Sequence, residues 1–250
     1  MMLSFSEKRI AISGGAIGFG REMALQFKAL SADVHVCDIR AEAMQELAEA
    51  GISTYVVDLC DRKAASDWIS RVSRQGASPI DVLINNAGGV AGQQGKAIEQ
   101  VTDAEWDSVL DINLNAAFAL SRAVAPLMKQ AGQGKIINIS SGAALKASLT
   151  GVQAYCAAKH ALLGLTRQLA HELGPFGIQV NAVAPGFVFT NEATKKQWDN
   201  FGEERQQQLL QSIALRRLGN VKDIANTAIF LASDLSSFIN GQIISVDGGS

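Results

Sequence analysis

The sequence predicts an α/β protein, a doubly wound parallel sheet of about seven strands with helices on both faces, in a single domain that spans residues 1–250. Short apolar runs alternate with helical segments along the chain, without repeats, low-complexity tracts or linkers. The first run leads directly into a glycine-rich turn and a helical pattern. With 250 residues, 48% of them apolar, the chain can bury a full core, and we expect no second domain.

The predicted strands are the short apolar runs, which lie near residues 9–13, 33–38, 53–57, 81–85, 135–139, 178–183 and 242–246. Helices are expected between them. Thr102 and Glu105 form a capping-box pattern at the start of a long predicted helix that reaches Gln130. A polar, helical insertion near residues 190–218 interrupts the alternation.

The glycine-rich turn predicts a dinucleotide site. Residues 13–20 read Ser-Gly-Gly-Ala-Ile-Gly-Phe-Gly, between the first strand and a helix. Glycines let the backbone approach a pyrophosphate, whose charge is held by the N–H groups and the positive dipole of the following helix. The second strand ends on Asp38, 18 residues after Gly20, where a carboxylate can accept hydrogen bonds from the adenosine ribose hydroxyls.

Tyr155 and Lys159 lie four residues apart on a predicted helix and therefore share one face. A phenol with a pKa near 10 is a poor acid or base at neutral pH, and a neighbouring ammonium lowers that pKa toward the working range. Such pairs also occur by chance, commonly as a tyrosine at the core edge and a solvated lysine. The other motifs of the chain support a catalytic role for Tyr155 and Lys159.

Together these motifs resemble the short-chain dehydrogenase/reductase family, and the match runs along nearly the whole length. Ser13 stands where the family's T-G-x-x-x-G-x-G turn has Thr, and it keeps the hydroxyl that braces the turn. Residues 85–88 match the family's N-N-A-G segment. The distance from Ser141 to Tyr155 is fourteen residues, one more than in many members, which implies a reshaped loop beside the substrate.

The resemblance implies a catalytic set of Asn113, Ser141, Tyr155 and Lys159. Ser141 would hydrogen-bond the substrate oxygen, and Tyr155 would exchange the hydroxyl proton. Lys159 would lower the tyrosine pKa and hold the nicotinamide ribose. Asn113 would position a water that passes the proton to solvent.

The resemblance also implies NAD as the cofactor. Asp38 would repel the 2′-phosphate of NADP, and no Lys or Arg stands just before Gly18, where NADP-using relatives often place one. Contacts with the cofactor are expected from Ser13, Gly14, Ile17, Gly18, Phe19, Gly20, Asp38, Asp58, Leu59, Asn86, Ala87, Gly88, Tyr155, Lys159, Pro185, Gly186, Val188 and Thr190.

In the resembled family, the insertion near 190–218 covers the substrate as a lid. The residues expected around the substrate are Ser141, Lys146, Gln153, Tyr155 and Asn191. The surrounding loops are small and polar and lack a dense aromatic wall, which favours a sugar, a sugar acid or another small polyol over a steroid. If Lys146 faces the site, it could pair with a carboxylate, although a lysine pointing to solvent has the higher prior.

The expected function is that of an NAD-dependent oxidoreductase that interconverts a secondary hydroxyl and a ketone. One alternative is a 3-oxoacyl carrier-protein reductase. Those enzymes grip the acidic carrier with basic residues at two positions that align here with Gly132 and Phe176. An alternative of another class is a nucleotide-sensing regulator without catalysis, which typically loses the tyrosine or the lysine, whereas this chain keeps the whole catalytic set.

Composition limits the remaining choices. A net charge of −2 and a pI near 5.9 give no field that favours nucleic acid. No stretch reaches the ~18 apolar residues that a membrane span needs, and we expect a cytoplasmic location. Cys37, Cys60 and Cys156 fit neither a disulfide framework nor a metal site, and the histidines are not grouped with other ligands, so no metal is expected.

A homotetramer is expected from the resemblance, in which the helices that carry Asn113 and Tyr155 and the C-terminal strand and helix form two interfaces. The long helix up to Gln130 supports this, because it presents more apolar surface than one sheet face needs. The apolar residues that suggest the excess are Leu110, Leu114, Phe118, Leu120 and Val124.

Overall fold

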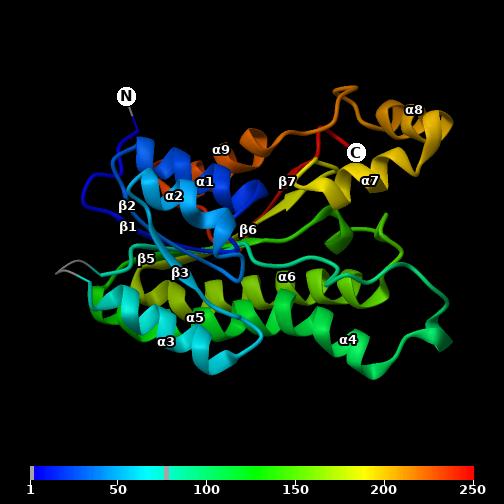
Figure 1. The fold of residues 1–250 in the computed structure, drawn as a ribbon. Coiled ribbons are helices and arrows are strands. Elements are labelled where there is room, and N and C mark those ends of the chain that lie inside the picture. The colour runs from blue at the N-terminus through cyan, green and yellow to red at the C-terminus, as the bar shows by residue number, and fades with distance from the viewer. Residues whose placement is uncertain (1–2, 76–78) are drawn as a thin grey trace.

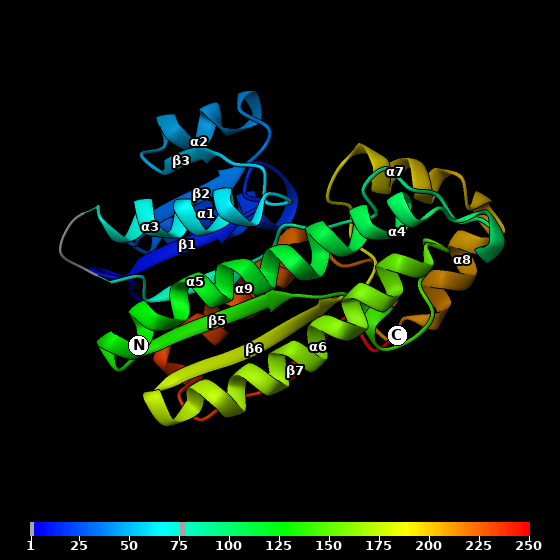
Figure 2. The ribbon, with the colours of Figure 1, turned by 90° about the horizontal axis from the view of Figure 1, so that it is seen from below.

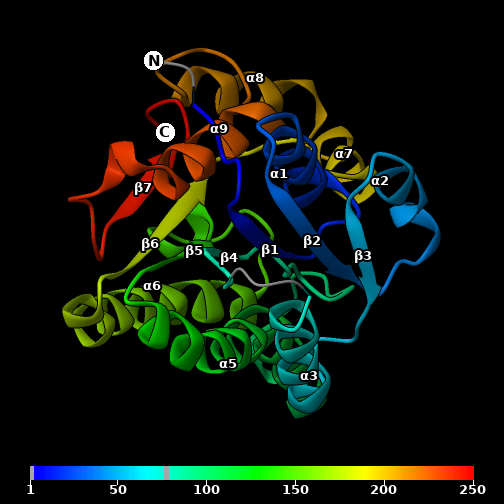
Figure 3. The ribbon, with the colours of Figure 1, turned by 90° about the vertical axis from the view of Figure 1, so that its left-hand side faces the viewer.

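The strands of the chain form one parallel sheet. The computed structural model describes residues 3–75 and 79–250 (Figure 1), and within them the strand order is β3-β2-β1-β4-β5-β6-β7 (Figure 3). The strands are β1 (Arg9–Ser13), β2 (Asp33–Asp38), β3 (Ser53–Val56), β4 (Val82–Asn85), β5 (Gly134–Ile139), β6 (Ile178–Pro185) and β7 (Ile243–Val246). The predicted fold class is confirmed, and each strand lies close to a predicted apolar run.

Helices cover both faces of the sheet, as the end-on view shows (Figure 3). One face carries α1 (Gly18–Ala29), α2 (Gln45–Glu49) and α9 (Val221–Ala232). The other face carries α3 (Arg62–Ser73), α5 (Ala116–Ala131) and α6 (Gln153–Leu173). From below, α5 and α6 are seen side by side along β5 and β6 (Figure 2).

The two helical layers bury two separate cores, because successive side chains of a strand point to opposite faces. On β1, Ile10 and Ile12 pack with Phe27 against α1 and α9. The residue between them, Ala11, packs with Trp68 of α3 on the opposite face. Strands buried on both faces read as continuous apolar runs, which is why these strands could be found in the sequence.

The predicted long helix is divided. It begins, as predicted, with a capping box between Thr102 and Glu105, but α4 (Asp103–Leu110) is separated from α5 by a π-helical turn at Asp111–Asn115. Such a turn inserts extra backbone into a helix and is frequent at functional sites. It carries Asn113, one of the predicted catalytic residues.

The order of the strands determines where a ligand can bind. Strands β2 and β3 are added on one side of β1 and strands β4 to β7 on the other, so the strand order reverses between β1 and β4, and open α/β sheets bind ligands at the carboxyl ends of strands at such a switch point. The insertion forms α7 (Glu192–Asp199) and α8 (Gly202–Ser212), which lie beyond these carboxyl ends (Figure 1). Within the described ranges, no helix has the length and apolar character that crossing a membrane requires.

Candidate active site

The glycine turn has the tight geometry that its sequence predicts. A Cβ on Gly14 would lie 2.7 Å from the Ala87 Cα, and one on Gly20 would lie 2.3 Å from the Gly14 carbonyl oxygen. Gly14 and Gly18 also have positive φ angles of 66° and 57°, a region that residues with a side chain rarely adopt. The turn therefore cannot accept larger residues without moving.

The turn leads into a helix end that suits an anion. No side chain caps α1 at Ile17, and its first turn contains no acidic residue, so the first backbone N–H groups are left for a ligand. Beside it, the Asp38 carboxylate accepts hydrogen bonds from the Ala16 N–H (3.1 Å) and the Arg40 N–H (3.1 Å). A dinucleotide with its pyrophosphate on α1 and a ribose at Asp38 fits this arrangement.

Ser13 and Asn86 fasten the turn to the end of β4. The Ser13 hydroxyl accepts hydrogen bonds from the Asn86 N–H (3.0 Å) and the Ala87 N–H (3.1 Å). In return, Asn86 Nδ2 donates to the Gly14 carbonyl at 2.7 Å and to the Ser13 carbonyl at 3.1 Å. The predicted bracing role of the position-13 hydroxyl is present in these bonds.

The other predicted cofactor residues line the same edge of the sheet. The exposed Asp58 carboxylate closes a turn onto the Cys60 N–H at 2.9 Å. Leu59 is buried in the core, so only its backbone could reach a ligand. Gly18 lies against Thr190, and Gly186 lies so close to Asp247 that a Cβ would be 2.8 Å from the Asp247 Cα.

The four predicted catalytic residues come together at this edge from β5, α6 and the π-helical turn. Ser141 lies close enough to Tyr155 for its side chain to act on the pKa of the phenol. Asn113 and Lys159 both face Gly88, because a Cβ there would lie 2.6 Å from Asn113 Oδ1 and 3.1 Å from Lys159 Nζ. Segments far apart in the sequence thus meet at one point.

Asn113 and Lys159 are held by the main chain. Asn113 Nδ2 donates to the Gly89 carbonyl at 2.7 Å, and its Oδ1 accepts from the Gly89 N–H at 3.0 Å. Asn113 Nδ2 also donates to the Val109 carbonyl one turn earlier, at 2.8 Å. Lys159 Nζ donates to the Ile139 carbonyl at 2.9 Å. The loop after β4 is thereby locked to the π-helical turn.

Burial shifts the pKa values of Tyr155 and Lys159. It raises the pKa of Tyr155 above its usual 10.0, while the Ser141 side chain acts in the opposite direction. Burial also lowers the pKa of Lys159 from 10.5 to about 8. The predicted lowering of the Tyr155 pKa by Lys159 does not appear here, since Lys159 Nζ donates to Ile139 and lies 5.7 Å from the Tyr155 ring centroid.

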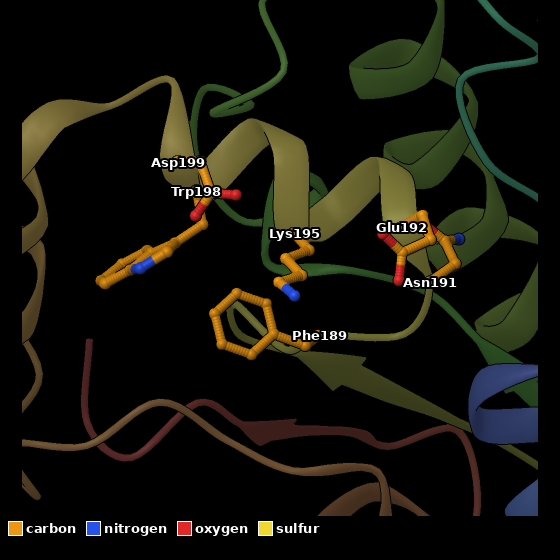
Figure 4. Close-up of a pocket in the computed structure, with 6 residues that line it drawn as sticks. All are labelled: Phe189, Asn191, Glu192, Lys195, Trp198 and Asp199. Carbon is orange, nitrogen blue, oxygen red and sulfur yellow. The ribbon is translucent and has the colours of Figure 1, made fainter.

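Three of the predicted substrate residues, Gln153, Asn191 and Lys146, lie in different surroundings. Gln153 is half-buried and fastens the loop after β4, because its Nε2 donates to the Lys96 carbonyl at 2.7 Å. Asn191 caps α7 and lines a pocket under the lid (Figure 4). Lys146 is exposed, and its Nζ lies 3.3 Å from the Ser250 hydroxyl.

The loop between Ser141 and Tyr155, one residue longer than in many members of the resembled family, turns at Gly151. That glycine has a φ of 69° and packs against Gly95, 3.2 Å from its Cα. The pair of glycines lets two main chains touch without side chains between them. A reshaped loop beside the substrate was predicted from its length, but the contact with Gly95 was not.

The lid contains aromatic rings that the prediction of small, polar substrate loops did not include. The lid and the segment before it contain four aromatic rings with neighbouring centroids 5.8–6.4 Å apart, named here the lid cluster: Phe187, Phe189, Trp198 and Phe201. The residues are spread over fifteen positions, and the helical spacing of Trp198 and Phe201 was the one signal that could have indicated it.

Comparisons with known proteins agree with the geometry. A family described as Enoyl-(Acyl carrier protein) reductase matches residues 14–250. A (2S)-[(R)-hydroxy(phenyl)methyl]succinyl-CoA dehydrogenase subunit from Thauera aromatica is 38% identical, over 97% of this chain and 96% of the relative. The 2-dehydro-3-deoxy-D-gluconate 5-dehydrogenase of Bacillus subtilis is 35% identical, over 98% and 95%. The 3-oxoacyl-[acyl-carrier-protein] reductase of Rickettsia felis is 34% identical, over 99% and 98%.

A solved structure from Beutenbergia cavernae, assigned as an NAD(P)-dependent gluconate 5-dehydrogenase, holds NADP at low occupancy. It superposes with a TM-score of 0.87 at 34% identity, covering 99% of this chain and 98% of that one. The chain belongs to the short-chain dehydrogenase/reductase family and is an oxidoreductase that interconverts a hydroxyl and a ketone.

Proposed function

We propose that the protein is an NAD-dependent dehydrogenase of a secondary hydroxyl on a sugar acid. The observation that carries the chemistry is the convergence of Ser141, Tyr155, Lys159 and Asn113 beside a glycine turn and an uncapped helix end. The substrate class is supported by relatives named for gluconate derivatives. Neutral sugars and small polyols are the neighbouring candidates within the same chemistry.

In the proposed mechanism, each residue has one task. Ser141 hydrogen-bonds the substrate oxygen and stabilises the charge that develops there. Tyr155 accepts the hydroxyl proton during oxidation and returns it during reduction. Lys159, held by the Ile139 carbonyl on the same side of α6 as Tyr155, would hold the nicotinamide ribose. Asn113 positions the loop after β4 and a water that passes the proton to solvent.

NAD, when bound, accepts or supplies the hydride. The glycine turn and the N-terminus of α1 would hold its pyrophosphate, and Pro185 and Gly186 would support the nicotinamide. Asp38 would bind the ribose hydroxyls and repel a 2′-phosphate. Arg40 is exposed nearby and is the cation that could weaken this preference.

A second candidate is reduction of a 3-oxoacyl group on a carrier protein, which is favoured by the relatives of that name. Against it, Gly132 and Phe176 stand where such enzymes carry basic residues. Lys129 is the nearest counterpart, because its Nζ lies 4.6 Å from the Phe176 ring centroid. One cation that also pairs with Glu172 is a weak docking surface for an acidic carrier.

We further propose a cytoplasmic homotetramer. Leu120 and Val124, which were expected to add to an interface, are fully buried within the chain, whereas Phe118 of α5 is 38% exposed. Near the C-terminus, Leu235 is 59% exposed and Phe238 is fully exposed. Two separate apolar surfaces support two two-fold contacts.

The test is a rate assay at 340 nm with purified protein, NAD or NADP, and a panel of sugar acids, sugars, polyols, sterols and a 3-oxoacyl thioester. We expect a sugar acid with NAD to give the highest kcat/KM. A higher value for the 3-oxoacyl thioester would favour the second candidate, and a sterol as best substrate would remove the proposed class.

A further inference from the structure

The ring of Tyr155 packs on a small apolar cluster that is separate from the two main cores. Three segments supply this cluster: the loop after β4, α4 and the start of α6, which lies beside α4 (Figure 2). Its members, named here the tyrosine cluster, are Val90, Trp106, Val109, Val152, Ala154 and Tyr155. Because buried side chains are closely packed, a shift of any one segment is passed on to the ring. The position of the phenol therefore depends on how the three segments are joined.

Lys96 joins the same three segments through polar contacts. It belongs to the loop after β4, and its carbonyl accepts a hydrogen bond from Gln153 Nε2 at 2.7 Å. Gln153 is the first residue of α6, with a member of the tyrosine cluster on either side of it in the sequence. The Lys96 ammonium donates to both carboxylate oxygens of Glu105 on α4, at 2.7 and 2.6 Å. One residue thus ties α4 to the start of α6, close to Tyr155.

Glu105 is itself fixed by the start of α4. Its Oε2 also accepts hydrogen bonds from the Thr102 N–H at 2.8 Å and the Thr102 hydroxyl at 3.0 Å. The Lys96 ammonium and these two bonds hold the pKa of Glu105 at about 2, so the carboxylate stays charged at neutral pH. The side chains of Lys96 and Glu105 are 31% and 28% exposed. Because a pair partly open to solvent adds little to stability, its main contribution is geometric.

The main chains of two loops also meet beside Lys96. A Cβ on Gly95 would lie 3.0 Å from the Thr150 carbonyl oxygen, so the loop after β4 touches the segment that precedes α6. The same loop is held at Gly89, whose N–H and carbonyl are hydrogen-bonded to the side chain of Asn113. The loop is therefore fixed at both ends, at Asn113 and at the start of α6.

We propose that Lys96, Glu105 and Gln153, named here the clamp, are positioning residues that set the Tyr155 phenol for proton transfer. The clamp acts through Tyr155, because it joins the three segments on which the ring packs. Gln153 was expected to contact the substrate, but its amide nitrogen is bonded to the Lys96 carbonyl, and the clamp gives it a role without substrate contact. The inference rests on the proposed function, in which Tyr155 moves the proton.

The first experiment separates the ammonium of Lys96 from its main chain. Lys96→Met removes the ammonium and keeps the carbonyl, whereas Lys96→Arg restores a cation that binds a carboxylate through two bonds. Gln153→Met removes the bond to the carbonyl. Lys63→Met is the matched control, because the Lys63–Asp67 pair has the same length of 2.6 Å but lies on α3. For each variant we measure kcat and KM with the two best substrates of the panel, the Kd of NADH, and Tm.

We expect Lys96→Met and Gln153→Met to lower kcat about tenfold for both substrates, because small displacements of a reacting group are costly. KM, the Kd of NADH and Tm should stay close to the wild-type values. Lys96→Arg should keep most of the activity, and Lys63→Met should match the wild type. The inference would be overturned by a rise in KM for one substrate alone, by an equal loss in Lys63→Met, or by a fall in kcat that follows a fall in Tm.

A second experiment observes Tyr155 without any substrate. The chain has two tyrosines, Tyr55 and Tyr155, so protein labelled with 3-fluorotyrosine gives two fluorine NMR signals, which Tyr55→Phe assigns. Tyr55 lies on the edge strand β3 and serves as the internal reference. We expect Lys96→Met and Gln153→Met to shift the Tyr155 signal and to leave the Tyr55 signal in place. An unchanged Tyr155 signal in both variants, or a shift of both signals, would contradict the clamp.

The clamp and the proposed mechanism can fail separately. Full activity of Tyr155→Phe would contradict the mechanism, while the fluorine signals would still show whether the clamp holds the ring. If Tyr155→Phe loses activity and the clamp variants do not, the mechanism stands and the clamp is refuted.

Discussion

The catalytic residues and the lid differ in how firmly the chain holds them. Asn113 and Lys159 are 1% and 3% exposed, and each side chain is hydrogen-bonded to main-chain carbonyls. In the lid, Phe189 is 43% exposed, and Lys195 is exposed without an ion pair in the described ranges. We infer that the chemistry is preorganised by the core, while selection of the substrate is left to side chains that a ligand completes.

The largest effect is expected from a change among the catalytic residues, which the chain holds firmly. Tyr155→Phe keeps the ring and removes the hydroxyl, so kcat should fall by roughly 10² to 10⁴ while cofactor affinity is retained. Initial rates and NADH fluorescence titrations measure the two quantities. Full activity of this variant would refute the role of Tyr155, whereas loss of NADH binding would mean that the fold was damaged.

Lys159 should make stability depend on pH. Burial lowers its pKa from 10.5 to about 8, so between these values the unfolded chain binds more protons than the folded chain. The free energy of unfolding contributed by Lys159 is therefore lowest below pH 8 and rises with pH. Tyr155, with its raised pKa, acts in the opposite direction only above its usual 10.0.

We expect the wild type to gain about 2 kcal/mol from pH 8 to 10 relative to Lys159→Met. Urea unfolding at fixed protein concentration measures it. Lys146→Met, at an exposed lysine, is the control and should follow the wild type. If the free energy of unfolding changed with pH by the same amount in Lys159→Met and the wild type, Lys159 would not be desolvated.

The glycine turn offers a steric test. Gly20→Ala places a Cβ 2.3 Å from the Gly14 carbonyl oxygen, and overpacking of about 1–3 kcal/mol should weaken cofactor binding by about tenfold or more. Gly164→Ala is the matched control, because a Cβ there meets no atom within 4 Å and the residue lies inside α6. Equal affinity in both variants, by calorimetric titration of NADH, would contradict the geometry.

Asp38 should give the smallest effect. We expect kcat/KM to favour NAD over NADP by about tenfold, or roughly 1.4 kcal/mol, and Asp38→Ala to bring the two cofactors closer. Asp58→Ala, which removes a charge at the edge of the same site, should leave the ratio unchanged. A wild type that prefers NADP would contradict the assignment.

The firmly held region is also the one that the sequence predicts. Strands buried on both faces appear as apolar runs, and the glycine turn at Gly14 and Gly20 leaves a pattern because Cβ atoms are excluded there. The π-helical turn around Asn113 could not be foreseen, since helical periodicity does not reveal one extra residue. The lid cluster depends on contacts between Phe187 and Trp198, eleven positions apart, which only the fold brings together.

The most direct test of the division between chemistry and selection is a profile of kcat/KM over the substrate panel for Tyr155→Phe and Trp198→Ala. We predict that Tyr155→Phe lowers kcat/KM by a similar factor for every substrate, because each substrate needs the same proton transfer. Trp198→Ala should change the order of the substrates, with sugar acids losing most. A uniform loss in Trp198→Ala, or a changed order in Tyr155→Phe, would contradict the division.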